Sequence, residues 1–100
     1  MKIITICGSL KFQKEMMITA QKLVLQGYCV FTHVYPVIDD IKITDEKLNL
    51  LKDEHFKKIE LSDAIVVINK NNYIGDSTRL EIKFAKKLNK EILYYSDLNI

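Results

Sequence analysis

The chain has 100 residues, of which 48% are hydrophobic and 28% are charged, and its 15 basic and 13 acidic side chains leave a net charge of +2. This composition is that of an ordinary folded protein, and it argues against disorder. The charge is too balanced to indicate a nucleic-acid polymer as partner, and no apolar run approaches the ~20 residues that a membrane span needs. Because this length suffices for one core, we expect a single domain over residues 1–100.

The amino terminus and the two cysteines both favour a cytoplasmic protein. Residues 1–7 carry one charge and a short apolar stretch without a cleavage site, so we interpret them as a strand rather than a signal peptide. Cys7 lies near the carboxyl end of one predicted strand and Cys29 near the amino end of another, where a disulfide is geometrically difficult. Free thiols fit a reducing compartment. The sequence has no CxxC pair and no Cys/His cluster at ligand spacing, so we expect no structural zinc.

The first part of the chain predicts a strand, a helix and a second strand. Residues 2–7 are short and β-branched, as in a buried strand, and Gly8-Ser9 follow it. Apolar residues at helical spacing predict a helix over 10–26, which Gly27 ends. Its inward residues are expected to be Phe12, Met16, Ala20, Leu23 and Val24. The next strand is predicted at 28–33.

A long connection then leads to a second helix. Residues 34–43 contain the single proline and mixed polarity, which indicates a loop, and long loops are often functional. Within it, the pair Asp39-Asp40 fits a solvated turn or a site for a metal or for ribose hydroxyls. Thr44 is expected to cap a helix at about 45–61. Its apolar side carries Leu48, Leu51, His55 and Ile59.

The remaining residues predict a strand, a helix and a last strand. Residues 63–69 form the clearest strand, a continuous apolar run typical of burial on both faces. After a turn at 71–75 a helix is predicted at about 78–88, with Leu80, Phe84, Ala85 and Leu88 inward. A strand at 91–95 and a tail at 96–100 complete the chain.

This alternation of strands and helices predicts the fold class. It indicates an α/β fold, a small three-layer Rossmann- or flavodoxin-like domain of about four parallel strands with helices on both faces. Ligands of such sheets bind beyond the carboxyl ends of the strands, where the strand order reverses. Those ends carry Gly8-Ser9, His33 to Pro36, and Asn69 to Thr78.

The turn after the first strand is the first candidate site. A glycine such as Gly8 lets a ligand approach the backbone, and the amino terminus of the next helix attracts anions. A turn glycine followed by a serine cap at Ser9 explains the same residues equally well. Residues 10–13 do not continue a GxGxxG pattern, so a dinucleotide fingerprint is absent.

The start of the third helix is the second candidate site. Gly75, Asp76, Ser77 and Thr78 are small or polar, and such residues at a helix amino terminus can cradle a phosphate or a sugar. Thr78-x-x-Glu81 also matches a capping box, which the pattern alone favours. Both interpretations can hold, because a capping-box glutamate still faces the pocket from the first turn.

Two histidines are further candidates. His55 lies on the apolar side of the second helix, where a lone histidine is more often a packed residue than a functional one. His33 ends a strand on the expected ligand side, which makes it the better candidate. The sequence shows no Ser-His-Asp or Cys-His arrangement that suggests nucleophilic catalysis by serine or cysteine.

Three segments of the chain resemble nucleoside 2-deoxyribosyltransferases and the related deoxynucleoside monophosphate N-glycosidases. They are Ile6-Cys7-Gly8-Ser9-Leu10, Leu61-Ser62-Asp63-Ala64-Ile65-Val66-Val67, and Thr78-x-x-Glu81-Ile82-x-x-Ala85. Together they cover nearly the whole chain in order and spacing. The chain resembles small uncharacterised members of this superfamily more than its established enzymes.

The resemblance implies an enzyme that cleaves or exchanges the N-glycosidic bond of a 2′-deoxynucleoside or its 5′-monophosphate. It implies a small-molecule nucleoside or nucleotide as partner, and no metal or organic cofactor. Glu81 matches the family glutamate that attacks the anomeric carbon and forms a covalent glycosyl-enzyme. Gly8 and Ser9 match residues that line the sugar or phosphate site, and Ser77 and Thr78 fall in the segment that holds the 5′ group.

Two acidic positions of the family differ in this chain. The aspartate that helps to protonate the leaving base is replaced by His55, which can also act as a general acid. The acidic residue six positions before the nucleophile is replaced by Gly75, with Asp76 one residue later. These differences leave a second interpretation open, a non-catalytic nucleotide-binding or sensing module on the same fold. A structural or interaction domain is a third.

The family and the small size together imply a homodimer or a larger assembly. The transferases complete their site with the carboxyl-terminal segment of a neighbouring subunit, which here corresponds only to residues 96–100. Tyr94 and Tyr95 are expected to be exposed at a sheet edge and to contribute to the interface.

Overall fold

The computed structural model describes residues 1–38 and 40–99, and its four strands form one parallel sheet. The strands are β1 (Ile3–Cys7), β2 (Cys29–Phe31), β3 (Ala64–Val67) and β4 (Glu91–Tyr94). The helices are α1 (Gln13–Leu25), α2 (Asp45–Leu61) and α3 (Asp76–Lys87). Three single 3-10 turns accompany them: η1 (Leu10–Phe12), η2 (Lys70–Asn72) and η3 (Tyr95–Asp97). The predicted α/β fold is confirmed.

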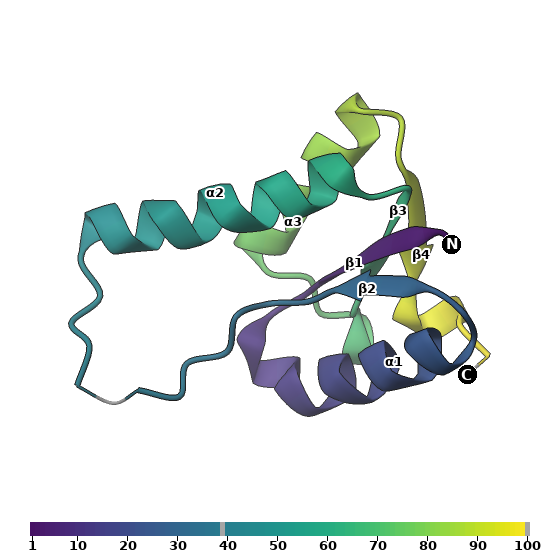
Figure 1. Ribbon diagram of the computed structural model, residues 1–100, viewed down its shortest axis with the longest axis horizontal. Coiled ribbons are helices and arrows are strands. Elements are labelled where there is room, and N and C mark those ends of the chain that lie inside the picture. Colours follow the sequence, from purple (N-terminus) through teal and green to yellow (C-terminus); the bar gives the residue numbers. More distant parts are fainter. Residues whose placement is uncertain (39, 100) are drawn as a thin grey trace.

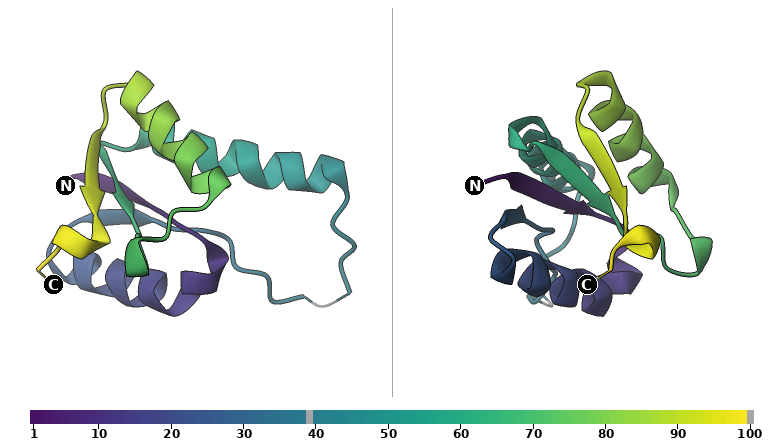
Figure 2. Two further views of the ribbon diagram at one scale, coloured as in Figure 1. Left: turned by 180° about the vertical axis from the view of Figure 1, so that it is seen from behind. Right: turned by 90° about the vertical axis from the view of Figure 1, so that its right-hand side faces the viewer.

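The helices cover both faces of the sheet (Figures 1 and 2). α1 packs on one face, where Met16 and Leu23 are buried against strand residues such as Ile6 and Val66. α2 and α3 share the other face, where Ile59 and Ile82 are buried with residues of β1 and β3. The two central strands therefore lie between layers of helix, which explains their continuous apolar sequences. No helix in residues 1–38 or 40–99 is both long enough and apolar enough to cross a bilayer.

The strand order places a crevice between β1 and β3. The order is β2-β1-β3-β4, so the chain moves to one side of β1 for β2 and to the other side for β3. The register pairs Cys7 with Val67 at the carboxyl ends of these two strands. Ligands of open α/β sheets bind where the order reverses in this way.

Several predicted element ends agree with the structure. The Thr44 side chain accepts a hydrogen bond from the Lys47 N–H at 3.2 Å, so it caps α2 as expected. Gly27, which follows the C-cap residue Gln26 of α1, has a φ of +99°, a left-handed conformation that favours glycine. Cys7 and Cys29 are free thiols, at opposite ends of neighbouring strands.

The predicted capping box of the third helix is wrong. α3 begins at Asp76, two residues before the expected start, and Gly75 in extended backbone is its N-cap. Thr78 is therefore the third helical residue rather than the cap, and Glu81 lies in the second turn. The first turn gains a favourable charge from Asp76 near the helix amino terminus instead.

Other differences concern edges and exposed faces. β2 ends at Phe31, so His33 lies in the following loop instead of ending the strand. Tyr94 and Tyr95 are half-buried and pack against the two core clusters, so the expectation that they are exposed is wrong. Five apolar residues expected to face inward are exposed because the buried stripe of each helix is narrower than the apolar pattern: Val24, Leu48, Leu51, Leu80 and Leu88.

The predicted tail is partly ordered against the sheet. The Ser96 N–H donates to Asn69 Oδ1 at 3.0 Å, and Leu98 packs against the core on the α1 side. This fixes η3 beyond the carboxyl end of β4. Ile100 lies outside the described residues, as does Asp39 of the loop between β2 and α2.

Candidate active site

A cavity of about 440 Å³ lies beyond the carboxyl ends of the central strands. Its walls come from the turn after β1, the loop after β2, the helix α2 and the start of α3. Nine residues singled out in the sequence line it: Gly8, Ser9, His33, His55, Gly75, Asp76, Ser77, Thr78 and Glu81. Four segments distant in sequence thus meet around one space.

The turn after β1 forms one wall under tight packing constraints. A Cβ added to Gly8 would lie 3.1 Å from Ile68 Cβ and 3.3 Å from Met16 Sδ, so packing alone disfavours a larger residue there. The Ser9 hydroxyl accepts a weak hydrogen bond from the Lys11 N–H at 3.4 Å and caps η1. Close packing against the core therefore accounts for the glycine at this position.

The start of α3 forms the opposite wall. Thr78 is buried, whereas Asp76 and Ser77 are exposed. No described side chain caps the first turn of the helix, so its amide N–H groups are available to a ligand.

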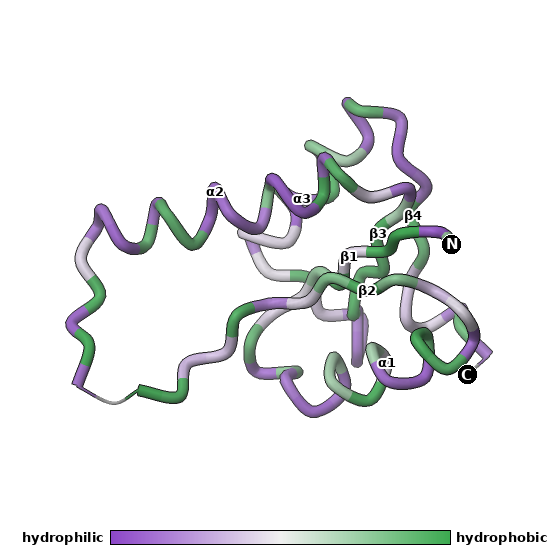
Figure 3. The backbone as a smooth tube through the Cα atoms, in the orientation of Figure 1, coloured by the Kyte–Doolittle hydropathy of each residue, from purple (hydrophilic) through white to green (hydrophobic). Residues whose placement is uncertain are grey.

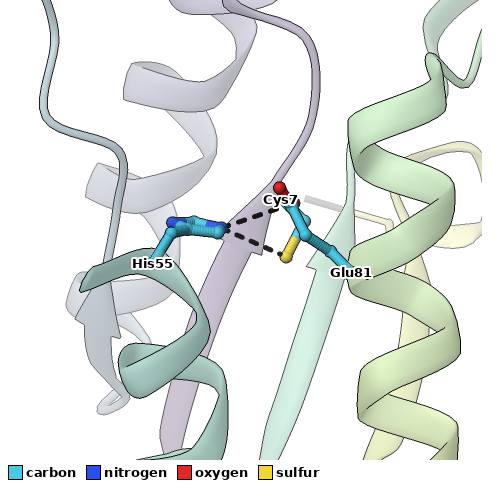
Figure 4. A group of neighbouring side chains, drawn as sticks. All are labelled: Cys7, His55 and Glu81. Carbon is cyan, nitrogen blue, oxygen red and sulfur yellow. Dashed lines mark hydrogen bonds and ion pairs between the residues drawn. The ribbon is translucent and has the colours of Figure 1, made fainter. Parts of the chain in front are cut away.

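Glu81 projects from the second turn of α3 and lines the cavity with a nearly buried side chain. It is 9% exposed, and its Oε1 atom has no hydrogen-bond partner among the described residues. This oxygen lies 3.4 Å from His55 Nε2, a close contact without the geometry of a hydrogen bond (Figure 4). Burying a carboxylate oxygen without a hydrogen bond costs free energy on folding, and such costly arrangements are found at functional sites.

His55 reaches the same point from α2. Its Nε2 atom lies 3.6 Å from Cys7 Sγ as well as 3.4 Å from Glu81 Oε1 (Figure 4). Because both neighbours face the same ring nitrogen, the three residues do not form a Cys-His-acid relay, which uses both nitrogens.

His33 completes the group by stacking on His55. The two rings are nearly parallel, with centroids 4.2 Å apart and an angle of 4° between their planes. Lys58 of α2 donates a 2.8 Å hydrogen bond to the Thr32 carbonyl and so anchors the loop that carries His33.

Burial determines the protonation of two of these residues. Burial lowers the pKa of His33 to about 4, and the neighbouring His55 contributes to the decrease. His33 is therefore neutral at neutral pH. Burial also raises the pKa of the Cys7 thiol, with a further contribution from the Glu81 charge, so Cys7 is protonated and poorly nucleophilic.

The sequence did not reveal the contact between Cys7, His55 and Glu81. Cys7 and His55 are 48 positions apart, and only the packing of β1 against α2 brings them together. Val34 and Tyr73, which also line the cavity, fall in the segments that the sequence placed at the ligand side. Lining residues that the sequence did not indicate as site residues are Leu10, Leu48, Leu51, Lys52 and Glu54. The apolar pair on α2, spaced by three residues, was a usable signal but resembled core. Asp40 is exposed and does not line the cavity.

Comparisons with known proteins identify the fold. No protein-family model and no curated protein matches the sequence. A solved 2-desoxiribosyltransferase from Leishmania mexicana is similar, with a TM-score of 0.69 and 17% identity over 95% of this chain and 64% of that chain. A conserved protein from Enterococcus faecalis V583 is similar with a TM-score of 0.66 and 14% identity over 94% of this chain and 62% of that chain. The chain spans less than two thirds of either protein. It has the nucleoside 2-deoxyribosyltransferase-like fold that the resemblance of its motifs implied.

Proposed function

We propose that this protein cleaves or exchanges the N-glycosidic bond of a 2′-deoxynucleoside or its 5′-monophosphate, with Glu81 as nucleophile. The observation that carries this proposal is the Glu81 carboxylate itself, which is nine-tenths buried, lines the cavity and has an oxygen without a hydrogen bond. The overturned capping box supports it, because Glu81 has no structural task at the helix end. The fold supports it as well, since one similar solved protein is a 2-desoxiribosyltransferase.

The proposed reaction has two steps. A Glu81 oxygen attacks C1′ of the deoxyribose, the bond from C1′ to the base nitrogen breaks, and its electron pair leaves with the base, which takes up a proton. The resulting glycosyl ester is then attacked at C1′ by water or by a second base. Glu81 leaves as a free carboxylate, and the sugar keeps its original anomeric configuration, as in retaining glycosidases.

We propose His55 as the group that handles the proton. It is a titratable side chain that lines the cavity beside Glu81, with 3.4 Å between Nε2 and Oε1. His33 stacks on its ring and fixes the ring plane. General acids of this kind contribute about 10²- to 10⁴-fold to a rate.

The two walls are proposed to hold the sugar and its 5′ group. The uncapped first turn of α3, with Ser77 and Thr78, offers amide N–H and hydroxyl donors to a hydroxyl or a phosphate. Gly8 and Ser9 offer backbone and hydroxyl contacts from the opposite side. Lys52 of α2 also lines the cavity and adds a positive charge suited to a phosphate.

A nucleotide-binding or sensing module without catalysis is the second candidate. Gly75 brings no carboxylate to the acidic position of the family, and Asp76 is exposed rather than turned into the buried part of the site. A sensor would bind a nucleotide in the same cavity and leave it intact.

Self-association is also part of the proposal. The segment between β2 and α2, together with the first half of α2, extends beyond the sheet (Figure 1). Apolar residues recur along it (Figure 3), and those exposed are Val34, Val37, Ile38, Ile41, Ile43, Leu48, Leu50 and Leu51. Exposed apolar surface of this extent favours burial against another protein surface, and we propose a second copy of the chain.

Base release from a panel of deoxynucleosides and their monophosphates tests the proposed activity. We expect the wild type to release free base, measured by chromatography with and without an acceptor base, and Glu81→Gln to lose about four orders of magnitude or more. Glu60→Gln makes the same change on an exposed part of α2 and should keep full activity. Tight binding of an intact nucleotide without base release would contradict the enzyme and support the sensor.

A further inference from the structure

We propose that Cys7, His55 and Glu81 form a Zn²⁺-binding site at the inner end of the cavity. One possible ligand atom from each residue, the thiol sulfur, a ring nitrogen and a carboxylate oxygen, lies within 4.8 Å of the other two. The three side chains come from β1, α2 and α3 and point toward one another (Figure 4). This site goes beyond the proposed activity, although it shares Glu81 and His55 with it.

The two distances from His55 Nε2 to its neighbours fit a tetrahedral zinc centre. Zinc binds sulfur at about 2.3 Å and nitrogen or oxygen at about 2.0 Å, so a tetrahedral ion separates sulfur from nitrogen by about 3.5 Å and nitrogen from oxygen by about 3.3 Å. The corresponding distances here are 3.6 Å from Cys7 Sγ to His55 Nε2 and 3.4 Å from that nitrogen to Glu81 Oε1.

The hydrogen bonding of the cluster is incomplete without an ion. A single N–H at His55 Nε2 cannot serve both neighbours, and Glu81 Oε1 is buried with no hydrogen-bond partner in residues 1–38 and 40–99. Cys7 is fully buried and His55 is 5% exposed, so water reaches these groups poorly. One Zn²⁺ ion would engage all three atoms at once, and the Cys7 thiol proton would pass to solvent.

The donor types favour zinc over the hard divalent cations. Sulfur and imidazole ligands favour zinc over magnesium or calcium, which prefer oxygen. Three protein ligands leave the fourth position of zinc open, and His55 and Glu81 both line the cavity, so this position faces the ligand space. Coordination to the ion would occupy the electron pair of the Glu81 oxygen that attack on C1′ requires. Bound Zn²⁺ therefore inhibits the proposed reaction.

Cobalt spectroscopy on the intact chain tests the site independently of any activity. Co²⁺ titrated into chelator-treated protein should give the strong visible bands of a tetrahedral ion and a thiolate-to-metal charge-transfer band, saturating at one equivalent, and Zn²⁺ should abolish both. Cys7→Ser should lose the charge-transfer band and weaken binding by about tenfold or more. The matched variant Cys29→Ser changes the other free thiol and should behave as the wild type.

A second variant covers the case in which Cys7→Ser fails to fold, as judged by circular dichroism. Glu81→Gln should keep the thiolate band but bind Co²⁺ more weakly. Octahedral Co²⁺ spectra, absence of the thiolate band in the wild type, or equal binding by wild type and Cys7→Ser would each overturn the site. If the wild type releases base, Zn²⁺ should stop the release and a chelator should restore it. Because the cobalt spectra need no substrate, they decide the metal site even if the glycosidic activity fails.

Discussion

At the scale of single residues, Glu81 is the centre of the account. Burying the Glu81 carboxylate costs free energy, and no hydrogen bond to Oε1 offsets this cost. His55 and Cys7 lie beside it but are not arranged as a Cys-His-acid relay. Residues that break the usual rules of packing in this way occur at functional sites. The local sequence supplied an ordinary explanation, the capping box, and the structure removes it.

The stacked histidines make stability depend on pH at the same scale. The pKa of His33 is about 4 in the folded protein, below its ordinary value of 6.5, so the unfolded chain binds a proton first as pH falls. The stability that His33 contributes by staying neutral in the folded protein is fully present above about pH 6.5 and is lost as pH falls toward about 4.

The variant His33→Gln cannot take up this proton and should lose less stability between about pH 7 and pH 4.5, measured by urea unfolding with a chelator present. We predict that the free energy of unfolding falls less in His33→Gln than in the wild type over this pH range. Equal losses in the two proteins would show that His33 titrates normally in the folded state.

At the scale of elements, the start of α3 is an open helix end. Gly75 caps it in extended backbone, with φ −76° and ψ 170°, and no described side chain accepts from the first amide groups. This arrangement suits a ligand that accepts those hydrogen bonds, at the expense of helix stability.

Restoring a side-chain cap tests this interpretation. A Cβ at Gly75 meets only the Tyr73 side chain, whose nearest atom, Oη, lies at 3.4 Å, so a larger residue fits. Gly75→Asp should raise the free energy of unfolding by a few tenths of a kcal/mol, roughly, because aspartate is a good N-cap. Gly75→Ala fills the same space without an acceptor and should be less stable than Gly75→Asp in thermal unfolding. Equal stability of the two variants would mean that the helix end is already satisfied.

The elements differ in how well the sequence predicts them. The apolar run of β3 and the Thr44 cap of α2 are local signals, and both are found where expected. The predicted start of α3 was wrong because the helix begins two residues earlier, at Asp76, with Gly75 in extended backbone as its N-cap, so Thr78 lies inside the first turn. The meeting of Cys7 with His55 depends on packing between distant elements, which no local pattern encodes.

At the scale of the whole molecule, the exposed apolar segment before and within α2 adjoins the cavity, because Val34, Leu48 and Leu51 belong to both. An assembly that covers this segment would also enclose the site. If the chain assembles in this way, the mass measured by light scattering should be at least twice the 11.7 kDa of one chain.

A charged substitution in the exposed segment, compared with one at an exposed leucine elsewhere, tests whether this segment is the interface. Leu50→Glu lies in the exposed segment and should shift the assembly toward monomers, since Leu50 is 63% exposed without lining the cavity. Leu25→Glu on α1, where the leucine is 79% exposed, should leave the mass unchanged. A wild-type mass of 11.7 kDa would contradict self-association.

The most direct measurement of the central claim is the intact mass of the protein during the reaction. A 2′-fluorinated nucleoside slows release of the sugar because fluorine disfavours positive charge at C1′, so the glycosyl ester should accumulate. The account predicts a mass increase of one fluorodeoxyribosyl group, located by peptide mapping on Glu81 and absent from Glu81→Gln. Base release by the wild type with no adduct on Glu81, and with full activity in Glu81→Gln, would contradict it.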